Sequence, residues 1–330
     1  MNDGDSSLTP IDLGASYRVL CEACGVLGFS DRTRLILSGD DRQSFLHNLC
    51  TNDIKKLSRG QGCEAFITNV QGKCLGFVTV LNADDEVIVE TVPQQADLLL
   101  SHFDRYLITE DVELEDVGSR TCELMVVGPR AVEQLEAVAE GALPSLAYDH
   151  IRTSMQGIDC RVSVIPWLRV PARMIIADVA ASSQLVSALT GAGCLPCDVE
   201  SFHRLRIESR FPWFGWDVTE NNLPQEVDRN ASAISFTKGC YLGQETVARL
   251  DALGHVNRSL VVVRGPDSIP LTPGSDVQVD GSQVGVITSA AALPNGDPAL
   301  ALAYLRCQFT DPGTVVQLST GAGEVITPVT

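Results

Sequence analysis

The order of strand-like and helix-like segments constrains the fold of this chain more than any other feature of its sequence. The first part of the chain begins with an apolar run at residues 34–38 and a helical pattern that ends near Leu49. Three strand-like runs follow at residues 65–70, 73–81 and 86–92, and a second helical pattern lies at residues 94–106. Turn residues such as Gln71-Gly72 separate these runs. Strand and helix do not alternate regularly, so the pattern predicts an antiparallel α+β domain.

A second block with the same order of elements follows. Its predicted elements are a strand at 123–127, a helix at 131–140, strands at 159–164 and 173–177, and helices at 182–191 and 198–208. Asp198 is a typical N-cap residue for the last of these helices. The two blocks share a pattern and not a sequence, and they predict two α+β domains.

The pattern changes after about Gly254 to short alternating runs. These runs lie at residues 258–264, 276–280, 283–288, 300–306 and 314–318. Proline, glycine and aspartate separate them, as in the predicted turn Pro294-Asn295-Gly296. Short strands at this spacing are typical of a small β-barrel or sandwich. The 330 residues therefore divide into three predicted domains, at 1–120, 121–254 and 255–330.

The charge and cysteine content narrow the class of protein. The 42 acidic residues outnumber the 24 basic ones, and the net charge of −18 disfavours direct binding to nucleic acid. Residues 1–14 lack the basic and apolar regions of a signal peptide, and the uncharged stretch at 179–197 is too polar to span a membrane. The 11 cysteines are odd in number and scattered, as expected for a reduced, cytoplasmic protein.

The most informative motif is Lys238-Gly-Cys-Tyr-Leu-Gly-Gln-Glu245. Gly239 and Gly243 allow sharp turns on either side of Cys240, and a short helix is predicted from Gln244. A thiol that lies just before a helix N-terminus and two residues from Lys238 is in a setting that favours the thiolate. The alternative is a glycine-bracketed turn around a packed cysteine.

This motif resembles the signature of the YgfZ-type folate-binding proteins, a branch of the superfamily of the glycine-cleavage T-protein, the aminomethyltransferase. The resemblance extends over nearly the whole chain, through Leu37–Asp53, Gln71-Gly72-Lys73, Arg206–Asp217, Asn222–Glu226 and the β-rich tail. It implies a fold of three domains in a ring, two α+β domains and a small β-barrel, with a folate pocket near the centre.

The resemblance also implies a function. It implies binding of tetrahydrofolate, or of a one-carbon-substituted folate, and a role in assembling or repairing iron–sulfur clusters in client enzymes, including some that modify tRNA. The expected partners are folate and iron–sulfur client or assembly proteins. Cys240 is the expected functional thiol, with Lys238 as its electrostatic support.

One departure from the superfamily pattern bears on catalysis. The aminomethyltransferases carry a pair of aspartates soon after the Gln-Gly turn, and alignment on Gln71-Gly72 puts Gly76 and Phe77 in those places. Neither side chain can accept a proton or pair with a cationic amine. An accessory role is therefore expected ahead of two alternatives, a folate-dependent aminomethyltransferase and a folate-free protein-binding module.

Several residues in the matched segments are candidates for folate binding. A reduced pterin presents an amino–imino edge that suits a carboxylate, for which Glu208 and Glu226 are the candidates. Arg249 or Arg206 could meet the anionic glutamate tail. The apolar walls could come from Trp213, Phe214, Trp216 and Tyr241. The alternatives are solvated glutamates and arginines paired with local acids, and aromatic residues that only fill the core.

Two Cys-x-x-Cys pairs, Cys21/Cys24 and Cys194/Cys197, raise the question of a metal site. The separation between the two pairs is far longer than in zinc ribbons, and no thioredoxin-like context surrounds either pair. No metal site is therefore expected.

Overall fold

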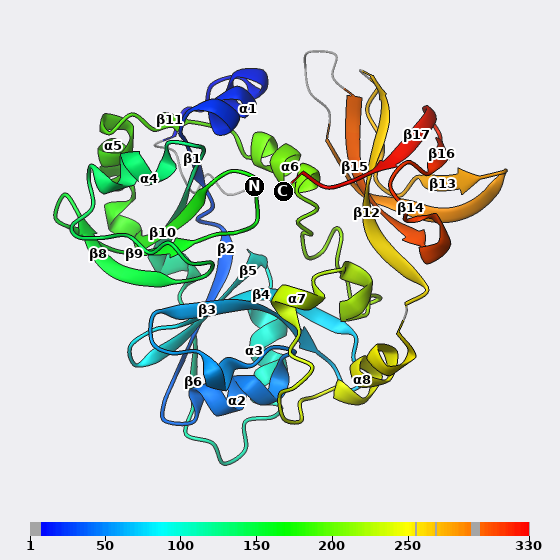
Figure 1. The fold of residues 1–330 in the computed structure, drawn as a ribbon. Coiled ribbons are helices and arrows are strands. Elements are labelled where there is room, and N and C mark those ends of the chain that lie inside the picture. The colour runs from blue at the N-terminus through cyan, green and yellow to red at the C-terminus, as the bar shows by residue number, and fades with distance from the viewer. Residues whose placement is uncertain (1–7, 255, 268, 292–297, 330) are drawn as a thin grey trace.

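A computed structural model describes residues 8–254, 256–267, 269–291 and 298–329. Two sheets and a closed six-stranded barrel are grouped around the centre of the molecule (Figure 1). The prediction of two α+β units followed by a small β-barrel is confirmed. The predicted turn Pro294–Gly296 lies outside the described residues, as do residues 1–7 of the N-terminal segment.

The first sheet has five antiparallel strands in the order β3-β4-β5-β2-β6. The strands are β2 (Arg32–Ser38), β3 (Gln61–Thr68), β4 (Cys74–Asn82), β5 (Glu86–Pro93) and β6 (Glu113–Asp116). β3 ends at Thr68, before the predicted Val70, because Asn69 begins a turn in which its amide donates to the Lys73 carbonyl at 3.0 Å.

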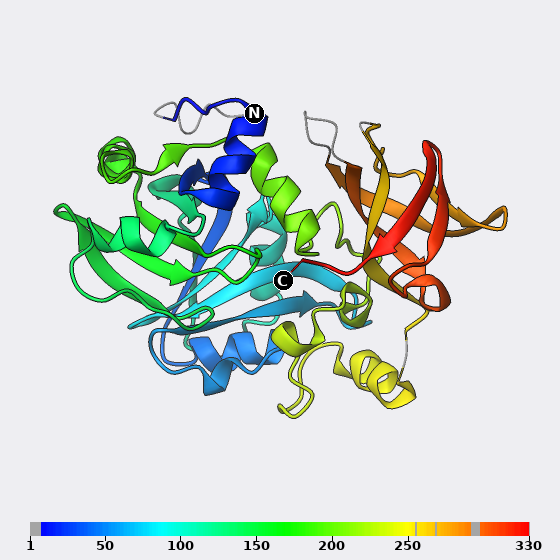
Figure 2. The same cartoon turned by 45° about the horizontal axis from the view of Figure 1, so that its top comes forward.

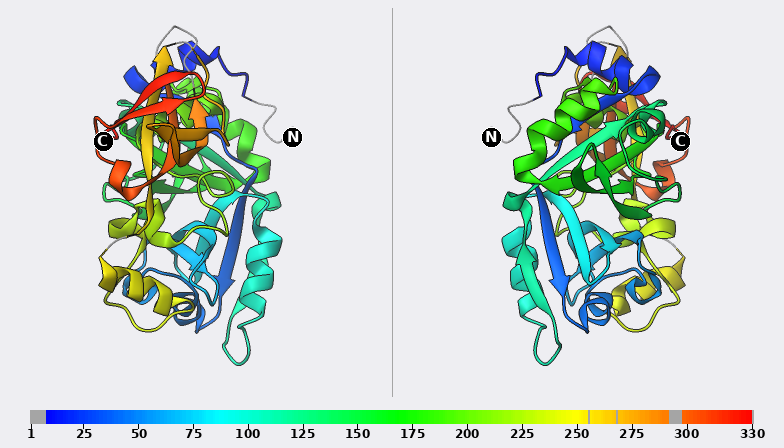
Figure 3. Two further views of the ribbon diagram at one scale, coloured as in Figure 1. Left: turned by 90° about the vertical axis from the view of Figure 1, so that its right-hand side faces the viewer. Right: turned by 90° about the vertical axis from the view of Figure 1, so that its left-hand side faces the viewer.

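Helices cover the outer face of this sheet. α2 (Arg42–Leu49) and α3 (Ala96–Asp104) pack against a cluster that includes Leu35 and Leu37, and Figure 3 shows α3 along the outer side of the sheet. Because side chains alternate along a strand, Arg34 on β2 points to the opposite, inner face. α3 begins at Ala96 and not at the predicted Gln94, whose φ of 63° is left-handed.

The second sheet has six strands in the order β11-β1-β7-β10-β9-β8, with β1 and β11 parallel and the other pairs antiparallel. The strands are β1 (Gly25–Gly28), β7 (Thr121–Val127), β8 (His150–Met155), β9 (Ile158–Val164), β10 (Ala172–Asp178) and β11 (Leu195–Pro196). α4 (Ala131–Glu136), shorter than the predicted 131–140, and α5 (Ser182–Gly191) pack on the outer face.

The first strand of the chain belongs to this second sheet, because β1 pairs with β7. α1 (Leu13–Glu22) does not pack on the first sheet either. It packs beside α6 (Val199–Glu208), as Figure 2 shows. The Asp198 side chain accepts from the Ser201 amide at 2.8 Å, so the predicted N-cap of α6 is formed. The division of the chain at residues 120 and 254 stays a proposal.

The barrel closes in the order β12-β15-β14-β13-β16-β17. Its strands are β12 (Arg258–Asp267), β13 (Asp276–Val279), β14 (Ser282–Ala291), β15 (Pro298–Arg306), β16 (Val315–Leu318) and β17 (Gly321–Ile326). Two further helices, α7 (Asn230–Ala233) and α8 (Gln244–Leu253), precede it. One buried cluster takes residues from both sheets, from α6 and from the barrel, so a common core joins the three units.

A buried ion pair connects α6 to the barrel. Arg206 donates to Asp217 at 2.7 Å and to Ser289 Oγ on β14 at 2.8 Å, and both members of the ion pair are almost fully buried. His203 Nδ1 accepts from Arg206 Nε at 2.9 Å. This contact needs the neutral imidazole, because a protonated ring has no free lone pair.

The buried neutral state of His203 predicts that the protein is less stable at low pH. Burial, followed by the charge of Arg206, lowers its pKa to about 3, whereas an unfolded histidine titrates near 6.5. The unfolded chain binds this proton first, so the free energy of unfolding falls as pH drops below about 6.5. Between pH 7 and pH 5 we expect His203→Gln, which keeps an acceptor for Arg206, to lose about 2 kcal/mol less than the wild type. Urea unfolding at the two pH values measures this difference, and equal losses would contradict the assignment.

Candidate functional site

The loop that carries the Lys238–Glu245 motif is held against the first sheet and α2. The Leu242 amide donates to the Asn48 carbonyl at 2.9 Å, and Thr68 Oγ1 donates to the Leu242 carbonyl at 2.7 Å. Lys238 is buried, and its Nζ donates to the carbonyls of His47, Cys50 and Asn52, the last two at 2.8 Å. The motif thus positions its loop through contacts with residues almost two hundred positions earlier.

Lys238 caps the C-terminal end of α2, where the last carbonyls of a helix lack partners within the helix. Burial lowers the pKa of its ammonium group, which lies 4.8 Å from the centre of the Tyr241 ring. Its three hydrogen bonds all go to the end of α2 and the residues that follow it. Electrostatic support of Cys240 by Lys238 stays a prediction.

Cys240 is exposed and opens onto a groove of about 330 Å³. The groove is lined by Phe45, Asn48, Leu49, Tyr106, Glu110, Cys240, Tyr241 and Leu242. The structure therefore brings two predicted site residues, Cys240 and Tyr241, to a single surface feature. α2 and the segment after α3 supply the other walls, and the sequence patterns had not connected them with the motif.

Two glycines bring the motif into contact with the Gln71-Gly72 turn. Gly72 (φ +75°) and Gly243 (φ +80°) are both left-handed, and a Cβ added at Gly243 would lie 2.7 Å from the Cα of Gly72. Such an approach is closer than a side chain tolerates. The two sequence motifs thus form one packed unit.

Replacement of Gly243 by alanine should therefore destabilise the protein more than replacement of Gly254. Gly254 is also left-handed, at φ +74°, but an added Cβ there would meet nothing within 4 Å. We expect Gly254→Ala to cost about 1–2 kcal/mol from backbone strain. Gly243→Ala should cost a further 1–3 kcal/mol or so from the clash. Urea unfolding compares the two variants, and equal losses would contradict the packed contact.

Gly76 and Phe77, the positions predicted to replace the acid pair, lie on β4. Phe77 stacks on Phe66 with ring centres 4.9 Å apart and lies 5.7 Å from Phe211. A Cβ added at Gly76 would meet Leu99 on α3, so this position faces the outer helices. An aromatic side chain thus takes the inner one of these two positions.

Phe77 borders a small central cavity of only about 20 Å³. It is lined by Arg32, Phe77, Val78, Thr79, Glu90, Thr91, Val92, Trp167, Phe211, Pro212, Trp213 and Phe214. Trp167 and Phe211 stack with centres 4.7 Å apart, and the Arg32 guanidinium lies 5.0 Å from the centre of the Trp167 ring. Of the predicted wall residues, Trp213 and Phe214 lie here.

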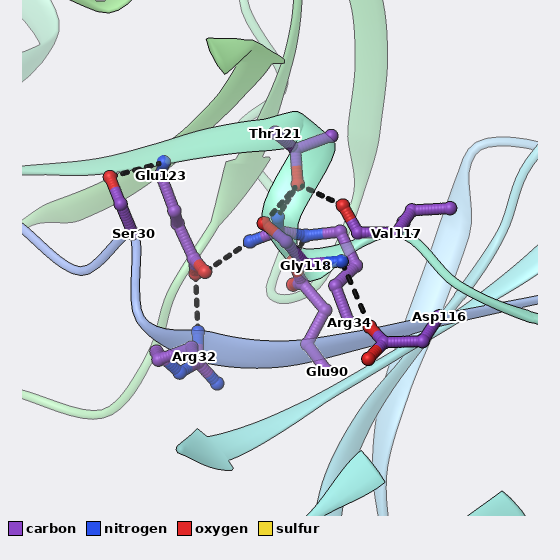
Figure 4. Close-up of polar contacts among 9 residues, drawn as sticks. All are labelled: Ser30, Arg32, Arg34, Glu90, Asp116, Val117, Gly118, Thr121 and Glu123. Carbon is purple, nitrogen blue, oxygen red and sulfur yellow. Dashed lines mark hydrogen bonds and ion pairs between the residues drawn. The ribbon is translucent and has the colours of Figure 1, made fainter. Parts of the chain in front are cut away.

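A network of buried charges lies next to this cavity (Figure 4). Glu123 on β7 pairs with both Arg32 and Arg34, and Arg34 Nε donates to Glu90 at 3.0 Å. Burial raises the pKa of Glu123, while both arginines lower it. The network connects β2 and β5 of the first sheet with β7 of the second. Arg32 and Arg34 occupy alternate positions on β2, and charged residues in such a pattern usually indicate a strand face exposed to solvent. The sequence analysis therefore did not predict that these two arginines form a buried network.

The predicted pterin contacts are both paired with arginine. Glu208, at the end of α6, accepts from Tyr17 Oη at 2.7 Å, from Arg204 at 2.9 Å and from Arg169 at 3.1 Å. Glu226 binds both Nε and Nη2 of Arg258, at 3.1 and 3.0 Å. The two carboxylates lie in separate networks, and neither glutamate lines the central cavity or the Cys240 groove.

The remaining predicted residues lie outside the central cavity and the Cys240 groove. Trp216 is half exposed, with its ring 4.9 Å from His203 and 5.4 Å from the Arg206 guanidinium. Arg249 is exposed on α8. Arg206, the other candidate for the folate tail, is committed to Asp217.

The two Cys-x-x-Cys pairs approach each other through one cysteine of each. The sulfur atoms of Cys24 and Cys194 are 3.3 Å apart in the buried space beside β1 and β11, and Cys21 instead accepts from Arg169 at 3.0 Å. Within the described part of the chain, no group of three or more histidine, cysteine or acidic side chains is placed to hold a metal ion. None of the described helices is both long and apolar enough to cross a membrane.

Comparisons with known proteins agree on one superfamily. The family model described as the GCVT N-terminal domain matches residues 12–238. A chloroplastic protein of Arabidopsis thaliana, named as a transferase, is 26% identical over 310 residues, which cover 92% of this chain and 70% of that protein. An aminomethyltransferase of Nostoc sp. is 24% identical over 313 residues, covering 92% of this chain and 82% of that protein.

A solved structure shows the same fold. The glycine cleavage system aminomethyltransferase T from Bartonella henselae superposes with a TM-score of 0.86 at 16% identity. The match covers 98% of this chain and 90% of that chain. The two sheets and the closed barrel described above are therefore the architecture of that enzyme.

Proposed function

Because this chain belongs to the GCVT N-terminal domain family, we propose that it is a tetrahydrofolate-binding accessory protein of the YgfZ type. In this proposal it supports the assembly or repair of iron–sulfur clusters in client enzymes, including tRNA-modifying enzymes, in the cytoplasm. The observation that carries the proposal is Phe77, which stacks on Phe66 and lies tilted against Phe211 at the inner position expected for a catalytic acid.

The surroundings of Phe77 argue against aminomethyl transfer. A transferase needs an acid that can work on the folate-borne amine. The carboxylate that lines the same cavity is Glu90, and it is held by Arg34 at 3.0 Å. This ion pair commits the Glu90 carboxylate to Arg34 and not to a bound amine. Robust aminomethyl transfer by the purified wild-type protein would overturn the accessory role.

The central cavity suits a pterin in its chemistry but not in its size. Aromatic walls, the Arg32 guanidinium and the Glu90 carboxylate match the apolar faces and polar edges of such a ring. A volume of about 20 Å³ leaves room for roughly one water molecule. Binding there therefore requires side chains that line the cavity to move apart. Glu208 and Glu226 stay proposed contacts, and each would have to exchange an arginine partner for the ligand.

Titration calorimetry with tetrahydrofolate tests the proposal directly. We expect saturable heat from the wild type, with either tetrahydrofolate or a one-carbon-substituted form. A matched variant, Trp167→Ala, removes one face of the aromatic stack and should weaken the affinity, whereas Phe236→Ala changes an exposed ring outside the cavity and should not.

A second candidate is a folate-free module that binds partner proteins, and the small volume of the central cavity favours it. Absence of saturable heat at millimolar tetrahydrofolate would select this alternative. Under either candidate, the exposed Cys240 groove is the proposed contact surface for iron–sulfur client or assembly proteins, since a thiol is a suitable ligand or nucleophile for such clusters.

A further inference from the structure

A separate cleft lies between the inner faces of the two sheets. It has a volume of about 420 Å³ and shares no lining residue with the central cavity or the Cys240 groove. Four arginines line it: Arg34 on β2, Arg120 just before β7, Arg152 on β8 and Arg161 on β9. The positive charge of these arginines contrasts with the net charge of −18 of the whole chain.

Two of these arginines face each other across adjacent strands. Arg152 and Arg161 are direct partners in the antiparallel register of β8 and β9. Like charges at directly opposite positions destabilise a sheet. The strand pair therefore keeps an unfavourable contact that an anion between the two guanidinium groups would relieve.

Arg161 is held in place but is only weakly neutralised. Its side chain is 10% exposed, and the nearest carboxylate, Glu86, lies 3.7 Å away. Its Nη1 contacts His150 Nδ1 at 2.8 Å. Burial, followed by the charge of Arg161, lowers the pKa of His150 to about 4, so the ring stays neutral and accepts this hydrogen bond. His150 thus orients the guanidinium without adding charge.

Most of the other charged side chains of the cleft already have an ion-pair or hydrogen-bond partner. Arg34 pairs with Glu90 and Glu123, and Arg120 pairs with Glu115 at 2.6 Å. Asp178 accepts from the Ala180 amide at 2.8 Å. Among the described residues, neither Arg152 nor Asp159 has an ion-pair partner within 4 Å. Arg152 and Arg161 are consequently the least neutralised cations of the cleft, since Glu86 at 3.7 Å from Arg161 is the nearest carboxylate to either in the described part of the chain.

We propose that this cleft binds a small dianion of the phosphate or dicarboxylate class between Arg152 and Arg161. Two planar guanidinium groups can each donate a pair of hydrogen bonds to the oxygens of such a ligand. The site goes beyond the proposed function, because it shares no residue with the proposed folate cavity or with the surface around Cys240.

Calorimetric titration of the full-length protein, at constant ionic strength, tests the site with two probes. One arm uses inorganic phosphate and the other uses glutarate, so the pair distinguishes the two ligand sources. We expect saturable binding of at least one probe, weakened about tenfold or more in Arg152→Gln, since the loss of one charged hydrogen-bonding group is worth at least that factor.

The exposed position of Arg152 makes this variant compatible with folding. The matched control is Arg130→Gln, which removes an exposed arginine on the far, outer side of the second sheet. Arg130→Gln should bind as the wild type does. Absence of saturable binding of both probes, or equal binding by Arg152→Gln and the wild type, would overturn the proposal.

Discussion

Replacement of Cys240 by alanine is expected to abolish rescue of iron–sulfur enzyme activity in a strain that lacks the endogenous protein. Cys240 is the exposed cysteine of the chain, at the mouth of a groove with apolar walls, whereas most of the others are buried. A thiol that acts on a cluster or on a partner must be accessible as well as nucleophilic. Enzyme activity in the complemented strain should fall to that of the empty vector.

The control separates function from stability. Cys240→Ala should bind tetrahydrofolate as the wild type does, because Cys240 does not line the central cavity. Cys307→Ala removes a partly exposed thiol on the barrel, whose Sγ lies 2.9 Å from the Val256 carbonyl, and it should leave rescue intact. Full rescue by Cys240→Ala would contradict a role of the thiol in the mechanism, but it would not contradict the proposal that the protein binds folate.

Replacement of Glu123 by alanine is expected to cause the largest loss of stability. Its side chain is fully buried and pairs with both Arg32 and Arg34 (Figure 4). Removing one partner of a buried ion pair leaves an uncompensated charge and costs about 3–5 kcal/mol. Because two arginines lose a partner here, we expect the upper part of this range or beyond, measured as the free energy of unfolding in urea.

An exposed pair of the same chemistry supplies the control. Glu133 binds Arg130 at 2.9 Å on the surface of α4, with both side chains more than half exposed. Surface pairs of this kind contribute about 0–1 kcal/mol, so Glu133→Ala should be nearly neutral. A loss of less than about 1 kcal/mol in Glu123→Ala would show that the sheet interface tolerates unpaired arginines.

Local structure was predictable where short-range physics decides it. The helix at 182–191, the Asp198 cap of α6 and the left-handed turn at Gly72 follow from apolar spacing, capping and backbone freedom within a few residues. Element ends were less predictable. α4 stops at Glu136, and β3 stops at Thr68, because hydrogen bonds to neighbouring segments end them earlier than the side-chain pattern does.

The candidate site was only half visible in the sequence. The motif around Cys240 marks a chemically distinct loop, and the residues at 76 and 77 mark the missing acids. The partners of Lys238 lie 186 to 191 positions away, and Tyr17 meets Glu208 across 191 positions. No local pattern encodes which distant carbonyl or carboxylate a charged side chain will meet.

By itself, the sequence determined two α+β units and a β-rich tail, and it predicted the functional motif and the absence of the acid pair, since each depends on residue types and spacings within a short stretch. Only the tertiary structure decided that Lys238 caps α2, that Glu208 and Glu226 are paired with arginines, and that Phe77 lines a central cavity with Trp167 and Phe211. The physical reason is that the burial and ion pairing of a side chain are set by segments that meet only when the sheets and the barrel pack together.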